Sequence, residues 1–247
     1  MRKNDGISIL ENERGKIVKL LENRRLTKEG FSNVIFIRVE PSDLETTISE
    51  IINHFQNMSW IDKFDENYKK RSFQSRSLPT VKFLKEKLEN HASDRITTDI
   101  GETVVSELSR SSLINQLDYL DVPLGELIKQ QISGNSGFDF FSETKNSVIV
   151  FGEAKYLSKK NAYGNAMEQV ERFVVESRDI SDLRDIEDFV SLSGLRNASD
   201  GVKAYACGFS STQIDTKNLI NHIIKNRYFS TLAKHNEVIY IAVNILI

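Results

Sequence analysis

The sequence predicts an α/β protein in which a central mixed β-sheet is flanked by helices, with an N-terminal α/β extension. Short apolar segments typical of buried strands alternate with segments of helical periodicity. In the C-terminal part their order is helix, two adjacent strands, helix, strand, helix, strand, which favours a sheet covered by helices. The length of 247 residues supports a large core, because a chain of this size buries about 73% of its unfolded surface.

The N-terminal elements are expected to be a strand followed by two helices. Residues 34–40 read Val-Ile-Phe-Ile-Arg-Val-Glu and predict a strand, because β-branched residues dominate. A helix should follow from Asp43 to about residue 57, since isoleucines and a phenylalanine recur on one face. Residues 60–77 are polar, aromatic and basic by turns and predict a linker or long loop. The second helix is expected over residues 79–91.

A change of pattern near residues 94–99 predicts a boundary between two regions. Residues 1–93 form the N-terminal α/β region, with partner docking or regulation as its expected role. Residues 94–247 form the larger region. Its expected elements are a helix at 101–117, strands at 136–142 and 147–154, a helix at 164–178, a strand at 202–209, a helix at 217–226 and a strand at 238–246.

Composition excludes several classes of protein. The single cysteine, Cys207, excludes a disulfide framework and a cysteine-based zinc cluster, and the four histidines share no metal-binding spacing. No apolar run approaches the length of a membrane span, and the polar N-terminus lacks the apolar region of a signal peptide, so a cytoplasmic location is expected. The net charge of -2 argues against a protein that coats DNA tightly, but it permits an enzyme with an acidic site.

Three residues form the constellation that carries chemistry. Glu153 and Lys155 end an apolar strand two positions apart, so their side chains share one face. Asp139 lies at the other end of a hairpin-like pair, where its carboxylate can approach that of Glu153. Two converging carboxylates without a neutralising arginine favour Mg²⁺. A lysine beside such a site can orient water and offset charge that develops on a phosphate.

This arrangement of Asp139, Glu153 and Lys155 resembles the motif of the PD-(D/E)XK nuclease superfamily. The resemblance covers about residues 100–210, although Gly137-Phe138 precede the aspartate where many members carry a proline. It implies a restriction-endonuclease-like fold and hydrolysis of DNA phosphodiesters with Mg²⁺, for which Mn²⁺ can substitute. Asp139, Glu153 and a further acidic residue would then hold the metal.

The resemblance also implies supporting residues on the flanking helices. The helix before the hairpin offers Glu102 or Glu107 as the further acid, and Glu102 is favoured because it follows a glycine that permits close approach. On the helix after the lysine strand, Gln169 matches a glutamine that some members carry. Lys159, Lys160 and Arg172 would contact phosphates, although solvated surface positions are the ordinary alternative for such residues.

The expected function is therefore that of a DNA endonuclease, a hydrolase of bacterial restriction or antiphage defence. In size and active-site class the chain resembles the accessory nuclease of Hachiman-type defence systems, which works with a helicase. The near-neutral charge suggests that a helicase or ATPase subunit, or a second copy of the chain, supplies much of the DNA affinity. The alternative is a catalytically inactive nuclease fold that binds nucleic acid or acts as a scaffold. A third interpretation is a purely structural subunit in which Glu153 and Lys155 lie at a protein interface. The ordinary alternative for these two residues is a surface ion pair on an exposed strand face.

Overall fold

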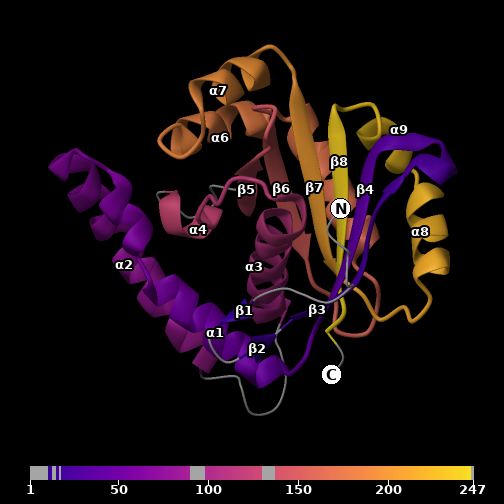
Figure 1. Ribbon diagram of the computed structural model, residues 1–247, viewed down its shortest axis with the longest axis horizontal. Coiled ribbons are helices and arrows are strands. Elements are labelled where there is room, and N and C mark those ends of the chain that lie inside the picture. The colour runs from indigo at the N-terminus through magenta and orange to yellow at the C-terminus, as the bar shows by residue number, and fades with distance from the viewer. Residues whose placement is uncertain (1–10, 13–14, 17, 90–97, 130–136, 246–247) are drawn as a thin grey trace, which may run out of the picture.

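A six-stranded mixed sheet forms the centre of the protein (Figure 1). The computed structural model describes residues 11–12, 15–16, 18–89, 98–129 and 137–245. In spatial order the strands are β3 (Val18–Leu26), β4 (Phe31–Pro41), β8 (Glu237–Val243), β7 (Lys203–Ser210), β6 (Ile149–Lys155) and β5 (Phe140–Glu143). A separate two-stranded pair consists of β1 (Glu11–Asn12) and β2 (Gly15–Lys16).

The four central strands are parallel, and the two edge strands are antiparallel to their neighbours. β4, β8, β7 and β6 run in the same direction, so their carboxyl ends meet at one edge of the sheet. In this register Glu153 on β6 lies opposite Cys207 on β7, which lies opposite Tyr240 on β8. The last residues of β6 therefore reach the carboxyl edge, where ligands bind in many open α/β sheets.

Helices cover both faces of the sheet and give a three-layered architecture (Figure 1). Apolar side chains of the helices before β5 fill mainly one layer, and those of the helices after β6 fill the other. The first group is α1 (Leu44–Gln56), α2 (Asn67–Glu89), α3 (Thr98–Leu117) and α4 (Gly125–Ile128). The second group is α5 (Tyr163–Val175), α6 (Arg178–Ile186), α7 (Leu192–Ser199), α8 (Thr216–Ile224) and α9 (Phe229–Leu232). Short 3₁₀ turns are η1 (Thr27–Glu29) and η2 (Ser59–Lys63).

The central strands are apolar on both faces because both faces are covered. Along β8, Ile239 and Ile241 enter the layer with α3, whereas Val238 and Tyr240 enter the opposite layer with α5. This explains the near-continuous apolar run at the end of the sequence, since a parallel strand between two helical layers needs no polar face. The prediction of a mixed sheet flanked by helices is confirmed.

The prediction of a linker or long loop over residues 60–77 is wrong. α2 already begins at Asn67, and Pro79, expected at a helix start, lies inside it. The proline is tolerated because it lies on the exposed side of the helix, where water can reach the carbonyl that lost its donor. Before α2, Trp60 packs edge-on against Phe73 and lies 5.5 Å from the ring of Phe189. The helix end expected at His91 lies outside the described residues.

The N-terminal region contributes directly to the main sheet. β3 was not among the expected strands, and together with β4 it extends the sheet beyond β8. The described residues on both sides of the boundary expected near residues 94–99 therefore contribute strands to the same sheet. The described part of residues 1–93 supplies two strands of the main sheet, β3 and β4, and two helices, α1 and α2. These elements share an apolar layer with α3.

Candidate active site

Glu153 and Lys155 lie at the carboxyl end of β6. The preceding residues of this strand are buried in the core. Glu153 is only 1% exposed, whereas Lys155 is partly open to solvent. The ammonium Nζ of Lys155 lies 3.0 Å from Oε1 of Glu153. The other oxygen, Oε2 of Glu153, is buried and has no hydrogen-bond partner within the described part of the chain. The strand thus carries a buried carboxylate that is only half satisfied.

Asp139 is held against β6 just before β5 begins. Its backbone N–H donates to the carbonyl oxygen of Gly152 at 2.8 Å. Its carboxylate Oδ2 accepts a hydrogen bond from the backbone N–H of Ala154, also at 2.8 Å. These two contacts continue the antiparallel β5–β6 pairing and bring the Asp139 carboxylate close to Glu153. The charge of Asp139 accordingly acts on the pKa of Glu153.

Glu102 reaches the same place from near the beginning of α3. Its Oε1 lies 3.4 Å from Nζ of Lys155. Gly101 makes this approach feasible, because a Cβ atom there would lie 2.2 Å from ring atoms of Tyr156, directly after the lysine. Glu107 lies elsewhere on α3, where it pairs with Arg110 at 2.7 Å. The structure therefore brings Glu102, and not Glu107, to Lys155.

A fourth carboxylate, Glu126 on α4, belongs to the same cluster and was missed by sequence reasoning. The backbone N–H of Gly125 donates to the carbonyl oxygen of Asp139 at 2.8 Å, which fixes α4 beside the aspartate. Burial, together with the charges of Asp139 and Glu102, raises the pKa of Glu126 to about 7, although Lys87 opposes the rise. The available signal was the Gly-Glu dipeptide, which occurs only at 101–102, 125–126 and 152–153 and supplies a cluster member each time.

The cluster holds more negative charge than one lysine can balance. Burial and the charge of Asp139 raise the pKa of Glu153 well above its usual value, against the opposing effect of Lys155. Burial also raises the pKa of Asp139, although Lys155 and the Ala154 N–H oppose it. For Lys155, burial acts to lower the pKa, but the charges of Glu153, Asp139 and Glu102 outweigh it and raise the pKa. The surroundings therefore favour the charged form of the Lys155 ammonium and shift the Asp139 and Glu153 carboxyls toward their protonated forms.

An ion pair fixes the peptide unit that precedes Asp139. Lys129 and Asp182 lie 3.0 Å apart across this segment. Asp182 Oδ2 accepts from the backbone N–H of Phe138, and Lys129 Nζ donates to the Phe138 carbonyl, both at 2.8 Å. Both polar groups of Phe138 are thus anchored at a position that no proline stiffens.

The remaining predicted residues lie apart from the hydrogen bonds and ion pairs that hold the carboxylate cluster together. Gln169 is half-buried on α5, and within the described residues no hydrogen bond joins it to the carboxylates. Lys159 and Lys160 are exposed after β6. Arg172 is exposed on α5, with its guanidinium 5.3 Å from the centre of the Phe173 ring. The structure therefore brings together Asp139, Glu153, Lys155 and Glu102. Outside that group lie Gln169, Lys159, Lys160 and Arg172.

The donor chemistry of the cluster suits a hard divalent cation. Among the described residues, no group of three or more histidine, cysteine, aspartate or glutamate side chains is arranged to hold a metal ion. The unpartnered Oε2 of Glu153 is nevertheless a buried acceptor without a donor, and the neighbouring donors are carboxylate oxygens of the kind that Mg²⁺ prefers. Asp139, Glu153 and Glu102 fit such an ion in chemistry and in excess charge.

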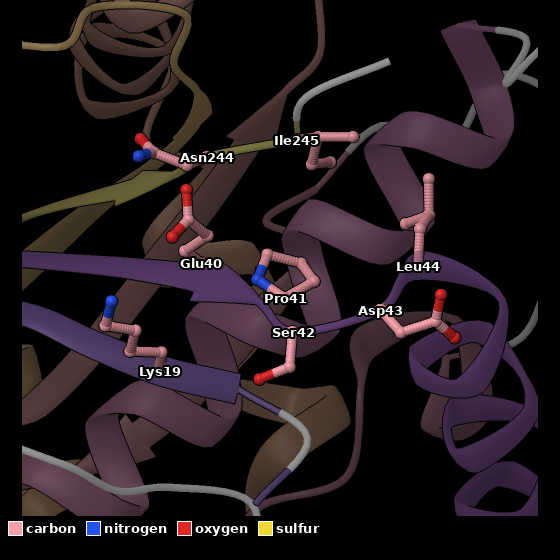
Figure 2. A pocket seen from close by; sticks show the side chains of 8 residues that line it. All are labelled: Lys19, Glu40, Pro41, Ser42, Asp43, Leu44, Asn244 and Ile245. Atoms are coloured by element: carbon pink, nitrogen blue, oxygen red, sulfur yellow. The ribbon is translucent and has the colours of Figure 1, made fainter.

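A separate hollow of about 620 Å³ lies at the carboxyl ends of β4 and β8. Lys19 reaches it from β3, Glu40 from β4 and Asn244 from the segment after β8 (Figure 2). Asp43 also lines it, but its carboxylate accepts the Thr46 N–H at 2.7 Å and caps α1. The hollow shares no lining residue with the carboxylate cluster, so it is not part of the candidate active site.

Comparison with known proteins gives no independent assignment. No protein-family model matches the chain, and no curated protein sequence matches it. None of the helices in the described residues is both long and apolar enough to cross a lipid bilayer.

Proposed function

We propose that the protein is a Mg²⁺-dependent DNA endonuclease that hydrolyses phosphodiester bonds. The observation that carries the proposal is the convergence of Asp139, Glu153 and Lys155, with a buried Glu153 oxygen that has no donor. A charge-rich buried cluster of this kind costs stability and is typical of functional sites. The restriction-endonuclease-like fold is supported by the antiparallel β5–β6 pair, the α5 crossover and the parallel β7.

In the proposed mechanism each residue has a distinct role. Asp139, Glu153 and Glu102 would hold the cation, which when bound neutralises phosphate charge and lowers the pKa of a bound water. Lys155 Nζ, positioned by Glu153 and Glu102, orients the attacking water and offsets negative charge on the phosphate oxygens. Water adds to phosphorus and the 3′ oxygen leaves, so the product carries a 5′ phosphate, as in the family that the motif resembles.

The proposal extends to the biological role of the protein. Bacterial restriction or antiphage defence fits the resemblance, with a helicase or ATPase subunit, or a second copy of the chain, as partner, and with a cytoplasmic location. The second candidate function is an inactive nuclease fold that binds nucleic acid or acts as a scaffold. Such a protein would need only the fold and a surface for nucleic acid or a partner, and not a bound cation.

Cleavage of supercoiled plasmid in Mg²⁺, Mn²⁺ or EDTA tests the proposal. We expect nicked or linear product that requires a divalent cation and is lost in Lys155→Ala and Glu153→Gln. Matched controls are Lys145→Ala, which removes an exposed lysine beside Asp118, and Glu143→Gln, which changes another buried glutamate of the same sheet. Equal cleavage by Lys155→Ala and wild type would refute the proposal. A wild type without cleavage that also shows no cation-dependent thermal shift would favour the inactive candidate.

A further inference from the structure

α2 is the most basic element of the described structure. It carries seven lysine or arginine residues and two glutamates over 23 residues, in a chain whose net charge is -2. The helix lies outside α4 at the side of the molecule (Figure 1), and the hydroxyl of Ser77 donates to the carbonyl oxygen of Leu127 at 2.6 Å. Because α4 carries Glu126, this basic helix borders the candidate active site.

One flank of α2 combines cationic and aromatic side chains. Lys69, Arg76, Phe83 and Lys87 are spaced by seven, seven and four residues, which aligns them along the helix. At one end of this flank, Lys69 pairs with Asp188 at 2.7 Å. At the other end, Lys87 is close enough to the candidate site for its charge to act on Glu126. The flank therefore extends along α2 from Lys87, near the carboxylate cluster, to Lys69.

In the middle of this flank, Arg76 has an Nε without a hydrogen-bond partner among the described residues, and the Phe83 ring is exposed. The guanidinium carbon of Arg76 lies 4.5 Å from the centre of the Phe73 ring, and the Nε atom is buried. An arginine stacked in this way is pre-ordered, and its N–H groups suit phosphate oxygens. Phe83 is 56% exposed, so its ring can stack on an unpaired base.

Two lysines on another side of the C-terminal half of α2 lie close to glutamates of the same helix. Lys82 lies 3.9 Å from Glu86, and Lys85 lies 3.6 Å from Glu89. These pairs lie on a different side of the helix from Arg76 and Phe83, because they differ in helical position. Lys82 and Lys85 therefore serve as a control for the loss of two positive charges from α2.

We propose that this flank of α2, with Arg76, Phe83 and Lys87, is the docking surface for a single strand of DNA that leads to the carboxylate cluster. The inference rests on the proposed nuclease function and names the form of DNA presented to that site. Arg76 and Lys87 bind phosphates, and Phe83 stacks on a base. Basic side chains that follow a strand, with an aromatic ring between them, are typical of surfaces that bind single strands without sequence preference.

Fluorescence anisotropy of a labelled oligothymidylate with the full chain in EDTA tests the proposal without cleavage. We expect the double variant Arg76→Gln/Lys87→Gln to bind at least about tenfold more weakly at about 0.1 M salt, and the slope of log K against log salt to fall by about 1.4. Phe83→Ala should weaken binding about fivefold or more. The control Lys82→Gln/Lys85→Gln should change affinity less than about twofold. Circular dichroism melting checks that each variant keeps its fold.

Several results would overturn the docking surface. These are equal losses in the flank and control variants, no binding of the oligothymidylate by wild type, or an equal effect of Phe83→Ala on a duplex probe. The outcome is separable from that of the proposed function. A flank-specific loss of binding in a protein that never cleaves plasmid would retain the surface and reject the nuclease. Metal-dependent cleavage by wild type, together with unchanged oligothymidylate binding by the flank variants, would retain the nuclease and reject the docking surface.

Discussion

Replacing Glu153 by glutamine should make the metal-free protein more stable while it abolishes the proposed activity. The side chain is 1% exposed, and its Oε2 has no hydrogen-bond partner in the described structure. An unsatisfied buried polar group costs about 1–3 kcal/mol, and more when it is charged. The substitution also removes the 3.0 Å ion pair with Lys155. We assign this loss about 1 kcal/mol, because Lys155 is 20% exposed and keeps Glu102 as a partner at 3.4 Å. The balance favours Glu153→Gln by about 1 kcal/mol, or about 2–4 °C in melting temperature.

The sign of the pH dependence follows from the raised pKa of Glu153. A carboxyl whose folded pKa lies above its unfolded value binds more protons when folded, so stability falls as the pH rises above about 4.3. The gain in unfolding free energy of Glu153→Gln over wild type should therefore be small near about pH 4. It should be larger near about pH 8, because Glu153 loses its proton as the pH rises. Added Mg²⁺ should raise the melting temperature of wild type but not that of the variant, because a cation bound to the folded state stabilises it.

Glu143 provides the matched control for this melting experiment. It is also a buried glutamate of the sheet, but its carboxylate accepts the backbone N–H of Ser191 at 2.7 Å and the hydroxyl of the same serine. Glu143→Gln should therefore lower stability by about 1–2 kcal/mol. If both substitutions lower the melting temperature equally at the higher pH, the reasoning that Glu153 is unfavourably placed is refuted.

Three further outcomes are expected. Because burial and nearby carboxylates raise the pKa of Glu126 to about 7, wild-type stability in EDTA should fall as the pH rises from about 4.5 to 7, and urea titrations of Glu126→Gln should show a flatter profile. Arg110→Met should destabilise the fold by about 3–5 kcal/mol, since Arg110 and Glu107 are both 3% exposed and 2.7 Å apart; a loss below about 1 kcal/mol in urea unfolding would contradict this. Asp182→Ala releases the Phe138 N–H, so under the proposed function kcat for cleavage should fall about tenfold or more with KM little changed, and an unchanged kcat would reject a positioning role.

Elements with strong apolar patterns could be predicted from the sequence. The runs in β6, β7 and β8 are buried on both faces, and α1 has a clear apolar stripe. β3 was missed because it is an edge strand in which charged residues interrupt the apolar pattern. The first half of α2 was missed because its residues are polar and basic. Its helical state comes from packing by residues such as Phe73, which the local pattern does not reveal.

From spacing alone, the candidate site was predictable only where two residues share an element or a hairpin, and Glu102 on α3 was expected only through the resemblance to the nuclease motif. The spacing of Glu153 and Lys155 on one strand fixes their common face, and the hairpin brings Asp139 to them. Glu126 could not be placed in the same way, because α4 has four residues and no periodicity. Its position depends on the long-range hydrogen bond between Gly125 and Asp139, which no local rule predicts.

The contact between Gly125 and Asp139 also bears on aggregation. β5 is an edge strand of the sheet, and an open edge can pair with the strands of other molecules. The segment from Leu120 to Gly125 covers this edge, since the Leu120 N–H donates to the Glu143 carbonyl at 2.9 Å and the Ser142 hydroxyl donates to the Leu120 carbonyl at 2.7 Å. The same segment delivers Glu126 to the cluster. Substitutions that loosen it should therefore expose a strand edge and displace a carboxylate together, so that solubility and the candidate site are lost as one.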